Sequence, residues 1–255
     1  MSIRVTMLGS GTSTGVPVIG CTCAVCTSDN SRNKRWRPGL KLEMDGQVVL
    51  VDTPTDLRAQ ALRFGLPRVD AVLFTHAHAD HVFGLDDLRI FNFRQRSPIP
   101  CYGSAATLRA LRQMFAYVFA EGQEGGGKPR LELVEVNGNF ALLDRMVVPV
   151  PVWHGGLEVY GYRFGNFAYV TDCNAIPDSS FELLAGVEVL ILDALRYRPH
   201  STHFSVAQAM DVAARIGASR TILTHLAHEI DHDAPAVALP PRVEFGYDGL
   251  VFDAD

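Results

Sequence analysis

The chain has 255 residues, a formal net charge of -5, 47% hydrophobic residues and 20% charged residues. This composition is typical of a globular protein with a sizeable core and excludes an intrinsically disordered chain. The 23 basic residues are spread along the chain and outnumbered by 28 acidic ones, which makes a long nucleic acid an unfavourable partner. No segment approaches the ~20 apolar residues of a membrane span, and residues 1–11 do not resemble a secretory signal, so we expect a cytoplasmic protein without a membrane partner.

The first predicted elements are strands. Residues 3–8 alternate between apolar and polar side chains, which is typical of a strand with one buried face. Residues 41–53 predict a hairpin, because Asp45-Gly46 is a strong signal for a two-residue turn. The second strand of this hairpin ends at Asp52.

Helices and a short strand follow. A helix is predicted over residues 56–64, and a strand of β-branched and aromatic residues over 69–74 leads directly to His76. Residues 105–120 again have helical spacing. The glycine-rich segment 121–129 predicts a mobile surface loop that could border an active site.

Strands dominate the rest of the prediction, at residues 147–152, 157–172 (with a turn at Gly165-Asn166), 187–192 and 221–224. A capping box of Ser205 and Gln208 begins a helix that Gly217 ends, and Asp248-Gly249 predicts the turn of a last hairpin. Strands with inserted helices favour an α/β fold of two packed sheets covered by helices. We expect one domain over residues 1–255.

Four potential metal ligands lie within six positions after the strand at 69–74, namely His76, His78, Asp80 and His81. Residues two apart point the same way in an extended segment, so His76 and His78 can bind one metal. If a helix begins near Asp80, then Asp80 and His81 turn toward a second metal. Imidazoles and a carboxylate suit Zn, Mn or Fe, and such a pair of ions activates water at neutral pH. The run therefore predicts a metal-dependent hydrolase.

Three of the five cysteines, Cys21, Cys23 and Cys26, crowd into one loop at residues 20–27. In a reducing compartment such a cluster favours metal binding over disulfides. The three thiolates are one ligand short of a closed tetrahedral zinc site, and His228 could supply the fourth. We therefore expect a structural zinc at this loop.

The run from His76 to His81 resembles the His-X-His-X-Asp-His signature of the metallo-β-lactamase superfamily. The resemblance implies a four-layer αββα sandwich with the metals at one edge, and further ligands at later strand ends. The implied assignment is His76, His78 and His154 on one metal, Asp80, His81 and His225 on the other, and Asp172 between them. An aspartate at 172, where true β-lactamases have cysteine, argues against lactam cleavage.

Asp52 is a candidate to orient a metal-bound histidine, since such histidines usually donate their second N–H to a carboxylate or carbonyl. Capping the turn at Thr53-Pro54 is an equally suitable role for it.

The cysteine loop and His228 narrow the resemblance to the PhnP-like phosphoribosyl 1,2-cyclic phosphate phosphodiesterases. In these proteins a Cys-X-Cys-X-X-Cys loop and a histidine beyond the last active-site histidine hold a structural zinc. The branch also carries a histidine just before the capping box, which is His203 here, with His200 as the alternative. At the edge of a helix N-terminus, a histidine can meet a phosphate and protonate its leaving oxygen.

The predicted function is hydrolysis of a small cyclic phosphodiester, such as 5-phosphoribosyl 1,2-cyclic phosphate, by two divalent metals, Zn or Mn. Asp80 and His203 are the predicted catalytic residues. The alternatives are a tRNA 3′-processing nuclease, whose long basic arm this sequence lacks, a thioester hydrolase, and a non-catalytic metal-binding protein, against which the complete ligand set argues. The resemblance also suggests a homodimer.

Overall fold

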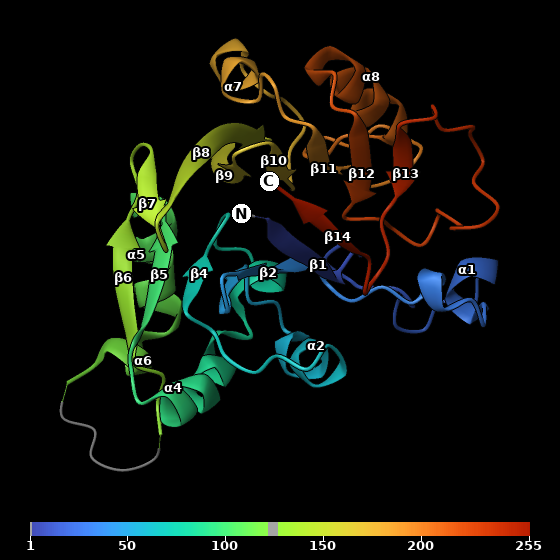
Figure 1. The fold of residues 1–255 in the computed structure, drawn as a ribbon. Helices are drawn as coiled ribbons and strands as arrows, with labels where there is room; N and C mark the ends of the chain where they lie inside the picture. Colours follow the sequence, from blue (N-terminus) through green and yellow to red (C-terminus); the bar gives the residue numbers. More distant parts are fainter. Residues whose placement is uncertain (1, 122–126) are drawn as a thin grey trace.

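The computed structural model describes residues 2–121 and 127–255, and within these residues the strands form two seven-stranded sheets (Figure 1). The first sheet contains, in spatial order, β14 (Val251–Ala254), β1 (Ile3–Gly9), β2 (Gly39–Met44), β3 (Gln47–Val51), β4 (Ala71–Leu73), β5 (Ile99–Gly103) and β6 (Leu131–Glu135). The second contains β13 (Val243–Phe245), β12 (Arg220–Thr224), β11 (Val189–Asp193), β10 (Phe167–Val170), β9 (Leu157–Phe164), β8 (Arg145–His154) and β7 (Phe140–Leu142).

Helices cover the outer faces of both sheets (Figure 1). On the first sheet and its loops lie α2 (Leu57–Arg63), α3 (Ala79–Val82), the 3-10 turn η2 (Leu85–Leu88), α4 (Arg89–Gln95), α5 (Ala105–Met114) and α6 (Ala116–Phe119). On the second lie α7 (Asp178–Leu183) and α8 (Val206–Ile216), while α1 (Ala24–Thr27) and η1 (Ser31–Asn33) belong to the cysteine loop region. The expected four-layer αββα sandwich is confirmed. None of the helices in the described part of the chain has the length and hydrophobicity that a membrane crossing requires.

Three apolar clusters hold the layers together. The central cluster, between the sheets, joins Met7 and Leu40 of the first sheet to Tyr162 and Phe167 of the second. A second cluster lies under α8, and a third packs α2, α4 and α5 onto the first sheet. Burial of this much apolar surface is the main stabilising term for such a fold.

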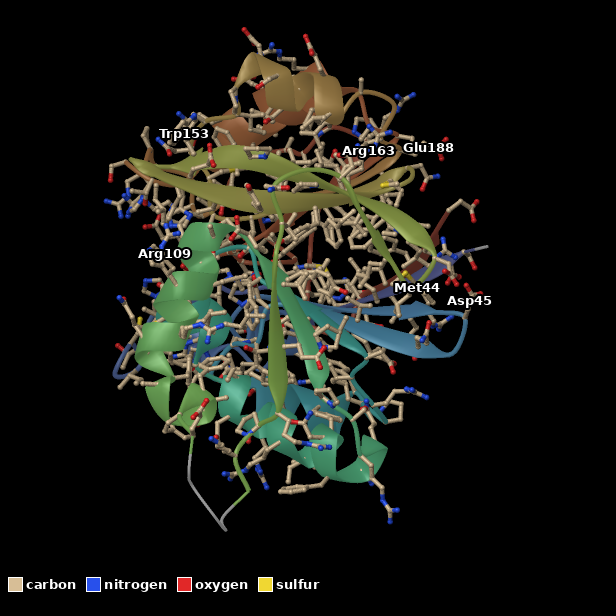
Figure 2. The ribbon with its side chains drawn as sticks, turned by 90° about the vertical axis from the view of Figure 1, so that its left-hand side faces the viewer. Met44, Asp45, Arg109, Trp153, Arg163 and Glu188 are labelled. Carbon is tan, nitrogen blue, oxygen red and sulfur yellow. The ribbon has the colours of Figure 1, made fainter. Side chains whose placement is uncertain are left out.

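The parallel strands of both sheets end at one edge of the sandwich. In the first sheet, β3, β4 and β5 run parallel, so Asp52 and His76 follow neighbouring strand ends. In the second, β10, β11 and β12 run parallel and bring Asp172, Asp193 and His225 to the same edge. Figure 2 shows Trp153, which precedes His154, at the opposite side of the sandwich from Met44 and Asp45 of the β2–β3 turn.

Several predicted elements differ from the structure. The predicted last hairpin is wrong: β13 pairs in parallel with β12, whereas β14 pairs with β1, so the turn at Asp248-Gly249 connects the two sheets. The predicted helix at 105–120 is divided, because Phe115 leaves the helical conformation at φ -112° and ψ 40° and packs its ring on Phe83. Of the glycine-rich segment 121–129, residues 122–126 lie outside the described residues.

Candidate active site

The first ligand-bearing segment changes from extended chain to helix within a few residues. His78 has extended backbone angles and is the N-terminal cap of α3, which begins at Ala79. His76 and His78 therefore precede the helix, whereas Asp80 and His81 lie in its first turn. The structure thus has the change of direction that the spacing predicts.

The seven side chains implied by the sequence form two groups at the edge of the sandwich. One nitrogen from each of His76, His78 and His154 lies within 4.8 Å of the others, and the same holds for one atom each of Asp80, His81, Asp172 and His225. His78 is exposed and the other six are buried, so the site opens to solvent on the side of His78.

Asp172 lies between the two groups. Its Oδ1 is 3.2 Å from Nε2 of His81 and 3.4 Å from Nε2 of His225. Its Oδ2 points toward the other group, 3.9 Å from Nε2 of His76. A carboxylate whose two oxygens face different histidine groups has the placement needed to bridge two cations.

Unpartnered nitrogen atoms indicate what the site could hold. Nε2 of His76, His81 and His225 is buried and makes no hydrogen bond of good geometry among the described residues, although oxygens of Asp172 face these atoms at 3.2–3.9 Å. Leaving a buried polar atom without a partner costs about 1–3 kcal/mol, so three in one place indicate side chains arranged to bind a ligand. Imidazole nitrogens with carboxylate oxygens suit divalent metals of the Zn, Mn or Fe type, and the residues fit such ions.

The charges of the site also indicate that it is suited to a divalent cation. Burial lowers the pKa of His76 well below its usual value, so this imidazole is neutral and can donate a lone pair. Burial also opposes protonation of His81, yet the carboxylates of Asp172 and Asp52 outweigh it and raise the pKa of His81 well above the usual value. The acidic half of the site therefore attracts positive charge, which a divalent cation would supply.

Backbone strain is concentrated at the same edge. Asp52, Asp172 and His225 follow strand ends with φ values of 65°, 52° and 61°, in the left-handed region that non-glycine residues rarely adopt. Such strain costs of order 1–3 kcal/mol per residue and persists where the surrounding structure enforces it, typically at functional sites.

Asp52 contacts a histidine of the site. Its Oδ2 lies 2.7 Å from Nδ1 of His81, and its two oxygens accept from the backbone N–H and the hydroxyl of Thr75. The contact with His81 supports the first of the two roles expected for Asp52, which is to orient a histidine of the site. The corresponding contact of His154 is between its Nδ1 and the carbonyl of Thr202, at 2.8 Å.

His203 reaches the site from the loop before α8. It is buried, and its ring stacks on that of His225 with centroids 4.6 Å apart. Its Nδ1 donates to Oδ1 of Asp193 at 3.2 Å, which leaves Nε2 available. His200 is less buried, and its Nδ1 accepts from the backbone N–H of Thr202 at 3.3 Å.

Asp193 is a further carboxylate at this edge, and no sequence pattern indicated a role for it. This fully buried carboxylate ends β11 and accepts hydrogen bonds from His203 Nδ1 and from the backbone N–H groups of Phe204 and Asp172. Because three donors occupy its oxygens, Asp193 suits orientation of His203 better than metal binding. Its position at the end of a strand beside β10, which ends just before Asp172, was the signal that could have identified it.

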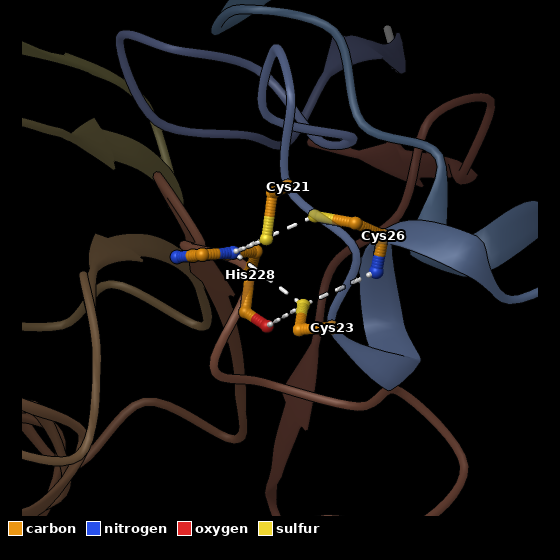
Figure 3. Close-up of side chains that lie close together, drawn as sticks. All are labelled: Cys21, Cys23, Cys26 and His228. Carbon is orange, nitrogen blue, oxygen red and sulfur yellow. Dashed lines mark hydrogen bonds between the residues drawn. The ribbon is translucent and has the colours of Figure 1, made fainter.

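The cysteine loop forms a separate cluster with His228. Figure 3 shows the three sulfur atoms converging on Nδ1 of His228, at 3.2 Å from Cys21 and 3.5 Å from both Cys23 and Cys26. Four ligands of a tetrahedral zinc, each roughly 2.0–2.3 Å from the ion, lie at such mutual distances. A hydrogen bond from the backbone of Cys26 lowers the pKa of Cys23 to about 6, whereas burial raises that of Cys26 to about 11. The cluster fits a zinc ion in donor type and geometry.

Comparison with known proteins identifies relatives of this fold and site. Residues 47–226 match the β-lactamase superfamily domain. A solved structure described as a new diphosphatase from the PhnP family is 41% identical, with a TM-score of 0.93 over 100% of this chain and 98% of that one. A protein of Porphyromonas gingivalis named octanoyltransferase is 40% identical over 97% of this chain, which spans only 51% of that relative. A ribonuclease Z of Mycobacterium avium is 27% identical over 88% of this chain and 85% of its own length.

Proposed function

The chain belongs to the PhnP family of the metallo-β-lactamase superfamily, and we propose that it is a two-metal phosphodiesterase acting on a small phosphodiester. The observation that carries the proposal is the position of Asp172, with one oxygen toward His81 and His225 and the other toward His76. Two cations on either side of this carboxylate would be close enough to act on one phosphoryl group.

We assign each of the two groups of side chains in the structure to one metal ion. His76, His78 and His154 would hold one ion, Asp80, His81 and His225 the other, and Asp172 both. When bound, the two ions supply Lewis-acid stabilisation of the phosphoryl oxygens and a water-derived nucleophile at neutral pH. Asp80 is also assigned the orientation of the attacking water, and Asp52 fixes the tautomer of His81 by accepting from its Nδ1.

His203 is the proposed general acid. With Nδ1 donating to Asp193, its Nε2 can deliver a proton to the oxygen that leaves phosphorus. Asp193 then stabilises the ring orientation, as a carboxylate behind a catalytic histidine does in other hydrolases. His200 is less suited, because it is less buried and packs its ring on that of His203, with centroids 5.3 Å apart, whereas His203 packs directly on His225.

Cys21, Cys23, Cys26 and His228 are proposed to hold a structural zinc. All three thiols are free in the structure, and free thiols persist most readily in a reducing compartment. This favours a cytoplasmic location.

A second candidate function is hydrolysis of a diphosphate linkage, favoured by the 41% identical structure described as a diphosphatase. The two reactions share attack at phosphorus and differ in the leaving group, which is an alkoxide in one and a phosphate in the other. Acyl transfer, suggested by the name of the Porphyromonas gingivalis relative, has less support. Cys101 and Cys173 are fully buried, and burial raises the pKa of both thiols, so neither suits an acyl carrier.

A substrate panel tests the proposal. Metal-loaded protein should hydrolyse 5-phosphoribosyl 1,2-cyclic phosphate or 2′,3′-cyclic nucleotides faster than dinucleoside diphosphates, precursor tRNA and acyl-glutathione thioesters. Faster cleavage of the diphosphates would favour the second candidate, and cleavage of precursor tRNA would identify a nuclease. No turnover of any phosphorus ester by the metal-loaded protein would refute both candidates.

A further inference from the structure

One short segment serves both metal-ligand clusters. His225, at the active site, and His228, at the cysteine cluster, are three residues apart in the irregular chain after β12. His225 has a φ of 61°, so its backbone must be held in place by the surroundings. Any displacement of this segment would therefore reach both clusters.

Backbone hydrogen bonds attach the beginning of the segment. The N–H of Leu226 donates to the carbonyl of Ser10 at 2.9 Å, and the carbonyl of Leu226 accepts from Thr12 at 3.2 Å. The N–H of Ala227 donates to the carbonyl of Leu195 at 2.9 Å. Within the segment, the N–H of Ile230 donates to the carbonyl of Ala227 at 3.2 Å, while the carbonyl of Ile230 depends on a side chain.

The guanidinium of Arg35 contacts the carbonyls on both sides of His228. Its Nη1 donates to the carbonyl of Ala227 at 3.2 Å and its Nη2 to that of Ile230 at 2.8 Å. Arg35 is 1% exposed, and its backbone pairs with Val16 in both directions. The planar fork of arginine can bind two acceptors at once, which the single ammonium of lysine does less well.

Burying this cation is expensive, which indicates a specific role. Its side chain donates to two carbonyls and to the amide oxygen of Asn33, all of them neutral acceptors. Burial lowers the pKa of Arg35 to about 10, so it remains charged at neutral pH. The carboxylates of Asp248 and Asp231 offset part of this cost, and the remainder is compatible with a role in which the hydrogen bonds of Arg35 fix a required geometry.

Asn33 extends the connection toward the cysteine loop. Its buried side chain accepts from Arg35 and from the backbone N–H of His232, and donates to Ser28, just beyond α1. The loop that carries the three cysteines and the segment that carries both histidines are therefore joined through Arg35 and Asn33.

We propose that Arg35 is a positioning residue that holds residues 226–230 and thereby couples the cysteine cluster to His225 of the active site. Loss of the ion from the cysteine cluster then loosens His225 and weakens metal binding at the active site. By linkage, the coupling acts equally in the opposite direction. The coupling depends on the proposed metal sites. The hydrogen bonds from Arg35 to residues 226–230 do not depend on them.

The test uses Arg35→Met, the conservative Arg35→Lys, and Arg32→Met as matched control. Arg32 is exposed in the same stretch of chain, and its guanidinium contacts His232 and the ring of Tyr247 instead of the segment. In metal-free protein, hydrogen exchange of peptides covering residues 224–231 should accelerate at least tenfold in Arg35→Met and remain unchanged in Arg32→Met. Unchanged exchange in Arg35→Met would overturn the proposal, whatever reaction the protein catalyses.

Metal retention provides the second readout. In zinc-loaded protein with a chelating dye, Arg35→Met should release active-site zinc at least tenfold faster than wild type, with partial rescue in Arg35→Lys. A lower melting temperature with unchanged zinc release would mean a merely structural arginine and would overturn the coupling. If Arg35→Met does not fold, wild-type protein decides: a mercurial that removes the thiolate-bound ion should accelerate loss of the active-site zinc, and independent loss would refute the proposal.

Discussion

Replacing His203 by alanine should slow hydrolysis of alkyl phosphodiesters by about 10²- to 10⁴-fold, the usual contribution of a positioned general acid. This corresponds to about 3–5 kcal/mol of activation free energy. The structure supports so large an effect because His203 is buried, stacks on His225 at 4.6 Å and is oriented by Asp193 at 3.2 Å. No other described side chain is placed in the same way over the second ligand group.

The assay compares two leaving groups. p-Nitrophenolate departs without a proton, so His203→Ala should slow cleavage of bis(p-nitrophenyl) phosphate by less than about tenfold. Hydrolysis of the cyclic phosphodiester should slow by the full factor of about 10²–10⁴. His200→Ala is the control and should change both rates only a few-fold. Equal large losses on both substrates would mean that His203 binds metal or supports the fold, and would refute its assignment as the general acid.

Three further predictions concern positioning, pH and packing. Asp52→Asn should weaken active-site metal binding about 10- to 100-fold by competition with a chelator, because its carboxylate holds Nδ1 of His81; unchanged affinity would contradict this role. Burial raises the pKa of Asp248 from 3.8 to about 6, so its stabilising contribution is fully present below pH 3.8 and is lost as the pH rises through 6. The unfolding free energy of metal-free wild type relative to Asp248→Asn should therefore fall by about 2 kcal/mol between pH 4 and 7 in urea denaturation, and a constant difference would argue against the raised pKa. Gly84→Ala would place Cβ 2.1 Å from the carbonyl oxygen of Pro54 and should destabilise the fold by about 1–3 kcal/mol, whereas Gly138→Ala, in open space, should not; equal melting temperatures would exclude the clash.

Local patterns explain which parts of the site were predictable. The spacing from His76 to His81 needs only an extended segment followed by a helix, and α3 begins at Ala79 as that pattern requires. The capping box at Ser205 and Gln208 is likewise complete in the structure. Both features depend on residues within a few positions of one another, so the sequence contains them directly.

Long-range pairing explains what the sequence could not reveal. The turn at Asp248-Gly249 has a genuine turn signal, but nothing local specifies that β13 joins one sheet and β14 the other. Asp248 itself accepts hydrogen bonds from Ser10 and Trp36, more than two hundred positions earlier. Its role in joining the sheets is visible only in the folded chain.

Long-range structure also explains why the role of Asp193 could not be predicted from the sequence. As a carboxylate at a strand end it is indistinguishable in sequence from a metal ligand, and its pairing with His203 depends on the path of the loop between β11 and α8. The parallel order of β10, β11 and β12, which aligns Asp172, Asp193 and His225, is a property of the sheet rather than of any one motif.

The central claim is that two ions on either side of Asp172 carry phosphodiester hydrolysis. The most direct measurement titrates metal-free protein with Mn²⁺ or Zn²⁺ while following hydrolysis of 5-phosphoribosyl 1,2-cyclic phosphate. Turnover should be absent in the metal-free protein, appear as the active-site pair fills, and remain near zero in Asp172→Ala at the same metal concentrations. Equal turnover in the presence of excess chelator, or full activity of Asp172→Ala, would contradict the claim.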